Sequence, residues 1–371
     1  MDERRIKRSG FLKTLFILLL FAVAIAAVAL AIRGQEEGGF RGLWQSISRG
    51  EMAEEFYYEN ASGGAFGDLN EGLAVLSPAG LTVFESDGET AFTRLFSWSS
   101  PAMDTAGKYG VAYNIGGKNA VFFDDRSVIL ELTTEYPVVS ASVNASGYLT
   151  VCTEESGYLG AVTVYNGGGT AIYRWHAGSG RILSADVRAG SELLILTVGS
   201  GGSRLVLQSL ASEEIKAEYV FPGLMIDAAF TGGGVTAVTT GSVLFLNGDL
   251  EEEAIYDFAG RYLTAYAIED AYTALALSDF QVGGVGVLVT LDANADELGR
   301  AAFSEEILSL DARGNTVAVL YTGRAETYSR ALEDAGRFDC DAGVERVLVR
   351  SDGSVLTAGA FSAYVHTTAE G

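Results

Sequence analysis

The sequence predicts an all-β fold, a β-propeller of about eight four-stranded blades, preceded by one N-terminal transmembrane helix. Residues 227–258 hold four short runs of small, β-branched and aromatic residues, separated by turns rich in Gly and Asn, which tolerate the positive φ of tight hairpins. Units of this kind recur with a period of about 40 residues, the usual spacing of propeller blades. An uncharged apolar segment near the N-terminus supplies the transmembrane helix.

The N-terminal segment is a candidate membrane anchor. Residues 1–13 form a basic tail, and residues 14–32 carry no charge. As a helix, this uncharged segment would reach about 28 Å, close to the thickness of the hydrocarbon core of a bilayer. Because the basic residues precede the span, the positive-inside rule predicts a single-pass protein of the cell membrane, with a cytoplasmic N-terminus and an extracellular C-terminal domain. A cleavable signal peptide is the alternative, since two Ala-x-Ala sites end the segment.

A short stalk joins this anchor to the body of the chain. Residues 33–53 are the predicted stalk, and residues 54–371 are the predicted extracytoplasmic propeller. With 46 Gly and 4 Pro, the composition suits many short strands joined by tight turns. The second strand of each unit is the easiest to align, because it follows directly on a turn. These eight runs span residues 72–76, 110–113, 147–151, 191–196, 234–238, 271–275, 314–320 and 353–357.

The two ends of the body are predicted to meet. The last unit contains three strands, and residues 54–59 form a spare strand at the other end of the body. A ring of sheets has no free edge only if its ends join, so this strand is predicted to complete the last blade. Seven blades is the alternative, because the first and last units are the least regular. Two stacked β-sandwiches would also supply many strands, but they do not predict so even a period.

The repeats resemble those of a known family. Two repeats carry the resemblance: V-T-A-V-T-T-G-S-V-L-F-L-N at 235–247 and G-N-T-V-A-V-L-Y at 314–321. Together with the basic N-terminus and the single apolar span, they resemble membrane-anchored, propeller-like proteins of Gram-positive bacteria. That family is known only as a domain of unknown function. More distantly, the repeats are similar to quinoprotein-type (PQQ-like) and WD40-type propellers. The strict signatures of those two groups are absent here. The resemblance therefore implies a fold, and no activity, cofactor or catalytic residue.

No motif predicts a cofactor or a metal. The two histidines, His176 and His366, are not clustered with other metal ligands in the sequence. Residues 292–297 alternate Asp and Asn as a calcium loop does, but they lack its Gly and its distal Glu, which favours a polar hairpin tip. Cys152 and Cys340 lie far apart in the repeat order, so no disulfide is predicted between them. The net charge of −23 argues against nucleic acid as a partner.

Aromatic and basic residues recur where the fourth strand of one blade leads to the first strand of the next. In a propeller, these crossovers lie on one face of the disc. The rings either fill the space between blades, which is the favoured interpretation, or form a rim that binds a peptide or a glycan. The candidate rim residues are Trp98, Tyr136, Trp175, His176, Arg181, Phe221, Arg261 and Tyr262.

Together these features predict a binding or scaffold protein, whose acidic propeller is presented outside the membrane to an envelope protein or a cell-wall glycan. The alternative is an extracellular hydrolase or lyase that acts on polysaccharide through two axial carboxylates. A sensor is a third hypothesis, although residues 1–13 are short for a signalling tail. The sequence does not single out a catalytic pair, and it leaves the oligomeric state open.

Overall fold

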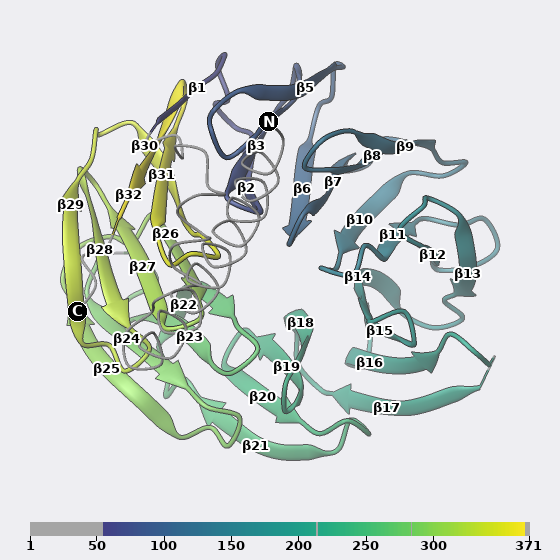
Figure 1. Ribbon diagram of the computed structural model, residues 1–371. Helices are drawn as coiled ribbons and strands as arrows, with labels where there is room; N and C mark the ends of the chain where they lie inside the picture. The colour runs from purple at the N-terminus through teal and green to yellow at the C-terminus, as the bar shows by residue number, and fades with distance from the viewer. Residues whose placement is uncertain (1–54, 213, 283, 368–371) are drawn as a thin grey trace, which may run out of the picture. The chain divides into compact units, whose positions relative to one another are not determined.

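The body of the chain is a ring of eight β-sheets. The computed structural model describes residues 55–212, 214–282 and 284–367 of the 371-residue chain. These residues form eight four-stranded antiparallel sheets, arranged as the blades of a propeller (Figure 1). The predicted fold class is confirmed for this part of the chain, and the alternatives of seven blades and of stacked sandwiches are wrong.

The predicted tail, transmembrane helix at 14–32 and stalk lie outside the described residues. Within the described ranges, no helix has both the length and the apolar character that crossing a membrane requires. The membrane anchor, and the cellular location that is inferred from it, therefore stay predictions.

Each blade is a meander that starts near the axis and ends at the periphery (Figure 1). The innermost strands are β2 (Ala65–Leu69), β6 (Pro101–Ala106), β10 (Val138–Val143), β14 (Arg181–Arg188), β18 (Met225–Thr231), β22 (Tyr262–Ile268), β26 (Ser309–Arg313) and β30 (Val344–Val349). We number the blades 1 to 8 in this order. The second strands are β3 (Gly72–Ser77), β7 (Tyr109–Asn114), β11 (Leu149–Thr153), β15 (Glu192–Gly199), β19 (Gly234–Thr239), β23 (Thr273–Ser278), β27 (Thr316–Tyr321) and β31 (Val355–Gly359).

The outer half of each blade follows the same order. The third strands are β4 (Gly80–Phe84), β8 (Asn119–Asp124), β12 (Ala161–Tyr165), β16 (Gly202–Ser209), β20 (Ser242–Leu246), β24 (Gly286–Leu291), β28 (Arg324–Ser329) and β32 (Ser362–His366). The outermost strands are β5 (Thr90–Leu95), β9 (Val128–Thr133), β13 (Ala171–His176), β17 (Ile215–Phe221), β21 (Glu252–Asp257), β25 (Glu297–Phe303), β29 (Asp334–Asp339) and, in blade 8, β1 (Glu55–Tyr57).

This up-and-down order gives the disc two different faces. The crossovers from an outermost strand to the next innermost strand share one face with the hairpins between second and third strands, and we call this the crossover face. The hairpins between first and second strands and between third and fourth strands lie on the opposite, hairpin face. The first strand of every blade therefore runs from the crossover face toward the hairpin face.

The core lies in the seams between blades. Strands β19 and β20 are buried along their whole length, because blade 5 packs against a neighbour on each side. Side chains alternate between the two sides of a strand. Val235 and Leu244 accordingly pack toward blade 4, whereas Val238 and Phe245 pack toward blade 6. In the described residues, eight such clusters fill the eight seams of the ring.

The ring closes by pairing its two ends. Strand β1 lies antiparallel to β32, with Phe56 opposite Ala363, so the first strand of the body completes the last blade as the sequence predicts. The Phe56 side chain is 1% exposed and meets the ring of Phe84 from blade 1 edge-on, at 5.8 Å between centroids. The Tyr58 hydroxyl donates to the Gly359 carbonyl oxygen at 2.9 Å. This strand therefore fills the seam between blades 8 and 1 as well as the edge of blade 8.

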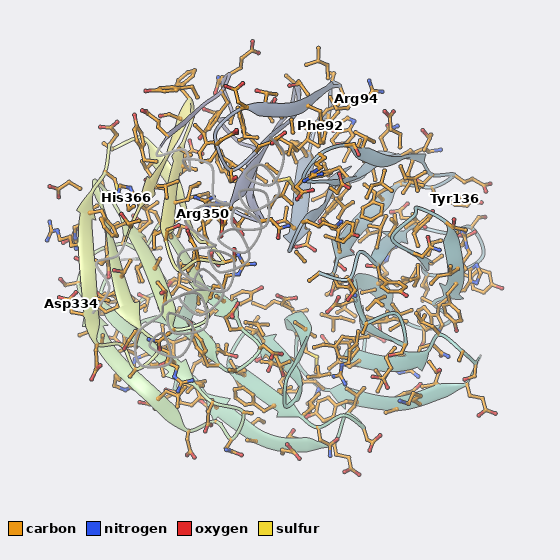
Figure 2. All side chains as sticks on the ribbon, in the orientation of Figure 1. Phe92, Arg94, Tyr136, Asp334, Arg350 and His366 are labelled. Carbon is orange, nitrogen blue, oxygen red and sulfur yellow. The ribbon has the colours of Figure 1, made fainter. Side chains whose placement is uncertain are left out.

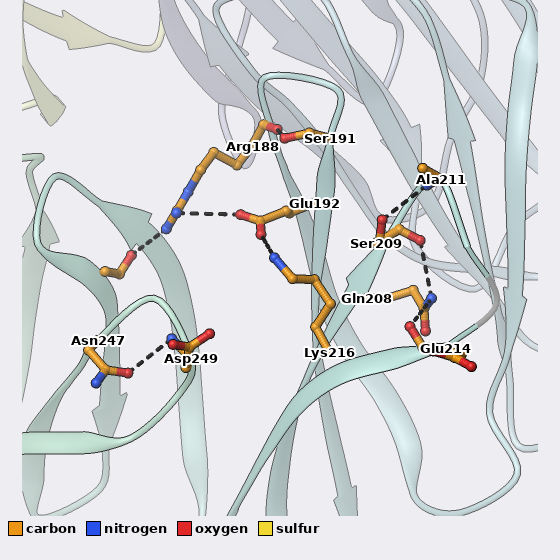
Figure 3. A network of polar contacts seen from close by, with 11 residues as sticks. Arg188, Ser191, Glu192, Gln208, Ser209, Ala211, Glu214, Lys216, Asn247 and Asp249 are labelled. Atoms are coloured by element: carbon orange, nitrogen blue, oxygen red, sulfur yellow. Dashed lines mark hydrogen bonds and ion pairs between the residues drawn. The ribbon is translucent and has the colours of Figure 1, made fainter.

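The hairpin face is polar. Asx turns at Asn166, Asn247 and Asp292 close hairpins there, because each side-chain oxygen accepts two backbone N–H groups from the turn. Asp292 belongs to the segment considered above as a calcium loop, and it caps the hairpin. Charged side chains link strands of blade 4 on the same face, where Glu192 on β15 pairs with both Arg188 on β14 and Lys216 on β17 (Figure 3).

Truncating Phe56 to Ala should destabilise the propeller by about 3–5 kcal/mol, because it removes a buried ring from the closing strand. Urea unfolding of the fragment from Ala53 to Gly371 measures the change. The neighbouring Tyr57, which is 70% exposed, is the matched control, and its replacement by Ala should cost no more than about 0.5 kcal/mol. Equal losses for the two variants would contradict this closure.

Candidate functional site

The innermost strands surround a cavity at the axis. Its volume is about 510 Å³, and side chains from β2, β18, β22, β26 and β30 line it. A second cavity of about 170 Å³ lies toward the hairpin face and is bounded by Asp68, Glu269 and Arg313. Asp311 and Leu348 line both cavities, so the two adjoin. The axial site is therefore partly apolar and partly polar at the crossover face, and it is charged at the hairpin face.

Carboxylates on the innermost strands join neighbouring blades. Innermost strands of adjacent blades belong to different sheets, so they share no ladder of backbone hydrogen bonds. Side chains provide the links that the backbone does not. The bonds are Val143 N to Asp104 Oδ2 (2.8 Å), Val349 N to Asp311 Oδ2 (2.7 Å) and Tyr266 Oη to Asp227 Oδ2 (3.1 Å), each donor lying one blade further along the chain.

Burial changes the acidity of these groups. Loss of water raises the pKa of Asp104 to about 7 and that of Asp311 to about 6, although the backbone N–H groups that they accept act in the opposite direction. Burial also raises the pKa values of Asp186 and Asp227, and both carboxylates add to the rise at Asp104. Across the described ranges, no three His, Cys, Asp or Glu side chains are placed to hold a metal ion.

Stability should therefore fall as the pH rises from about 4 to about 7. The folded-state pKa of Asp104 lies above its unfolded value, so the native state binds more protons than the unfolded state in this window. Asp104→Asn should flatten this slope, because an amide oxygen can still accept the Val143 N–H. Thermal unfolding between pH 4 and pH 8 measures it, with the exposed Asp87→Asn as control. An unchanged slope in Asp104→Asn would refute the assignment.

A charged cluster joins blades 7, 8 and 1 near the axis. Asp68 on β2 accepts a hydrogen bond from Arg313 Nη1 at 2.6 Å, and its other oxygen lies 3.5 Å from Arg350 Nε. Arg350 is 1% exposed and lies toward the inside of the ring, whereas Tyr136 lies near its periphery (Figure 2). In the part of the chain that the structure describes, none of the Arg350 guanidinium nitrogens has a hydrogen-bond acceptor. Asp68 is thus the counter-charge of a fully buried cation.

Asp68→Asn should cost about 3–5 kcal/mol of unfolding free energy, because it leaves the Arg350 guanidinium buried without a counter-ion. The double variant Asp68→Asn, Arg350→Met should recover most of this loss, since it removes the uncompensated charge. Chemical denaturation of both variants, alongside Asp87→Asn, tests the expectation. A double variant no more stable than the single one would rule out the ion pair as the cause.

Three of the predicted rim residues fill seams between blades. Trp98 is 8% exposed and stacks on Phe96 at 3.6 Å between ring centroids. Trp175 packs against the cluster between blades 3 and 4, and Phe221 packs against the cluster between blades 4 and 5. These rings occupy the positions of the favoured, space-filling interpretation.

The other predicted rim residues lie nearer the surface of the crossover face. The His176 ring packs against Tyr158 at 4.6 Å between centroids, and Arg261 pairs with Asp279 at 2.8 Å. Tyr136 is half-buried, Arg181 is exposed and Tyr262 is 46% exposed. All eight predicted residues share the crossover face, but they are distributed from blade 1 to blade 6, and none lines either axial cavity.

A separate cavity between blades 7 and 8 contains a thiol and an imidazole. Its volume is about 320 Å³, and it is lined by Cys340, Thr357 and His366 among others. His366 Nε2 lies 2.9 Å from Thr357 Oγ1. Burial raises the pKa of Cys340 and lowers that of His366, so both groups are neutral near pH 7 and the thiol is not activated as a nucleophile. Cys340 and Cys152 are both free.

The residues at the mouth of the axial cavity are not recognisable from the sequence. Ile226, Leu308 and Arg346 reach it from β18, the segment before β26, and β30. Each lies within or just before an innermost strand, where a single apolar or basic residue gives no signal of its own. Phe280 and Val282 were detectable, because large apolar side chains are unusual in a hairpin loop next to Gly.

Comparison with known proteins agrees with this architecture. A model for a family of unknown function, DUF5711, matches residues 45–200. No curated protein matches the sequence. BamB from Moraxella catarrhalis superposes with a TM-score of 0.58 at 10% identity, over 85% of this chain and 99% of that chain. Sqt1 from Saccharomyces cerevisiae superposes with a TM-score of 0.61 at 11% identity, over 84% and 98% of the two chains. At such identities, the likeness shows a propeller fold and nothing further.

Proposed function

We propose that this protein is a binding or scaffold protein, anchored in the cell membrane by residues 14–32, whose crossover face engages an envelope protein or a cell-wall glycan outside the membrane. The distribution of exposed apolar side chains carries the proposal. Of the eighteen large apolar side chains that are exposed in the described residues, eleven belong to the crossovers, to the hairpins between second and third strands, or to the crossover ends of innermost strands. They are Ile115, Tyr158, Leu159, Leu224, Ile226, Tyr262, Phe280, Val282, Val285, Leu308 and Phe361.

The remaining seven lie on the outermost strands. They are Tyr57, Leu95, Ile172, Ile215, Val220, Ile255 and Leu298. Scattered exposed apolar residues are ordinary on any protein surface, but their concentration on one face is typical of an interaction surface. The polar hairpin face lacks this property in the described residues, so the proposal assigns binding to one side of the disc.

The inner-strand carboxylates favour binding over hydrolysis. A glycosidase needs two carboxyl groups that are free to exchange protons with the substrate. Asp104, Asp227 and Asp311 instead each accept a hydrogen bond from the neighbouring blade. We therefore assign these carboxyl groups to the assembly of the ring.

A face-resolved crosslinking experiment in intact cells tests the proposal. Single cysteines replace Phe280 on the crossover face or Lys108 on the hairpin face, in a Cys340→Ser background. A membrane-impermeant thiol-to-amine crosslinker is then added. Both variants should react, because both faces lie outside the membrane, and only Phe280→Cys should join a discrete envelope partner.

The outcomes separate the two parts of the proposal. If neither cysteine reacts, the proposed extracellular location of the propeller is wrong. If both react but Phe280→Cys yields no adduct beyond those of Lys108→Cys, the assignment of binding to the crossover face is wrong.

A further inference from the structure

The axial cavity has a wall that is partly apolar and partly polar, and two charged side chains, Asp311 and Arg346, are part of its lining. Apolar side chains from four innermost strands and the segment before β26 form the apolar part of the wall, among them Phe66, Ile226, Leu263, Leu308 and Leu348. At about 510 Å³, the cavity is large enough for one or two bulky amino-acid side chains. Ile226 and Leu308 are 40% and 37% exposed at its mouth, so the apolar wall continues onto the crossover face.

The polar groups of the cavity are already used within the protein, with one exception. Tyr266 Oη donates to Asp227, and Thr264 Oγ1 donates to the Ala276 carbonyl oxygen. The remaining polar acceptors are also occupied: Ser309 Oγ accepts Val347 N and Asp311 Oδ2 accepts Val349 N.

The exception is Arg346, which lines the cavity and is exposed. Its guanidinium has no ion pair or side-chain hydrogen bond to any described residue. A guanidinium at the edge of an apolar cavity is suited to a carboxylate, which it can hold with two parallel hydrogen bonds. The position of Arg346 therefore specifies the sign of the charge on the ligand.

We propose that the axial cavity binds an extended peptide segment, which inserts an apolar side chain into the part of the cavity lined by β18, β22 and β26 and places a carboxylate next to it on Arg346. A peptide fits better than a small molecule, because the exposed apolar residues Leu224, Tyr262 and Phe280 extend the surface beyond the cavity. The net charge of −23 repels a run of acidic residues, so the segment carries one carboxylate at this point. This inference rests on the proposed function and names the ligand of its crossover face.

Peptide selection on the full chain tests this inference. The detergent-solubilised protein is immobilised and presented with acetylated heptapeptides that are randomised at the three C-terminal positions. One half of the library ends in an amide and the other half in a free carboxylate, which distinguishes a side-chain carboxylate from a chain terminus. Enriched peptides should place a large apolar residue beside Asp, Glu or the free terminus.

Two substitutions and two matched controls locate the binding. Arg346→Glu and Ile226→Asn should each weaken binding of the enriched peptides by about tenfold, because they reverse the charge and interrupt the apolar wall. Arg126→Glu, an exposed arginine on the hairpin face, and Val220→Asn, an exposed apolar position on β17, should leave the affinity within about twofold. Circular dichroism melts confirm that all four variants fold.

Several results would overturn the inference. These are an absence of enrichment over the Arg346→Glu protein, enrichment of apolar–basic peptides, or affinities insensitive to Arg346→Glu or Ile226→Asn. If Phe280→Cys still captures a partner in cells while the peptide selection fails, only the axial ligand is wrong. If the crosslinking fails as well, the proposed function is wrong too.

Discussion

The pairing of β1 with β32 is the constraint on which the rest of the propeller depends. Every blade has apolar side chains on both of its faces, so each sheet is stable only between two neighbours. If β1 and β32 separated, the seam that contains Phe56 and Phe84 would open, and its cluster of buried apolar side chains would be exposed to water. Residues near the N-terminus of the body therefore determine whether its C-terminal blade can exist.

The axis presents a different physical problem from the seams. The innermost strands converge there, but they belong to separate sheets, so their backbone groups do not form a ladder of hydrogen bonds with one another. Buried aspartates connect them, at the expense of raised pKa values for Asp104 and Asp311. Where blades 7, 8 and 1 meet, Asp68 serves the same purpose for two arginines. Each of these carboxylates thus contributes to the assembly of the ring.

The two faces of the disc differ in polarity because they are formed by different kinds of connection. Tight hairpins on the hairpin face contain Asn and Asp, whose side chains accept hydrogen bonds from the backbone of the turn. Crossovers on the opposite face must span from the periphery to the axis, and they present apolar side chains such as Leu224 and Leu308 on the way. The axial cavity opens among these residues, so one side of the protein combines an apolar surface with a hollow at its centre.

By itself, the sequence determined the blades. Alternating short apolar runs, Gly-rich turns and an even period identify strands such as β19 and β20, and the spare strand near Phe56 indicates how the ring closes, because these properties are local or periodic. The axial site is neither local nor periodic. Ile226 and Arg346 are 120 positions apart in the numbering and line one cavity only because blades 5 to 8 curve around one axis. Only the tertiary structure decided which aromatic rings fill seams, as Trp98 does, because burial depends on the adjoining blade and not on the residue's own strand.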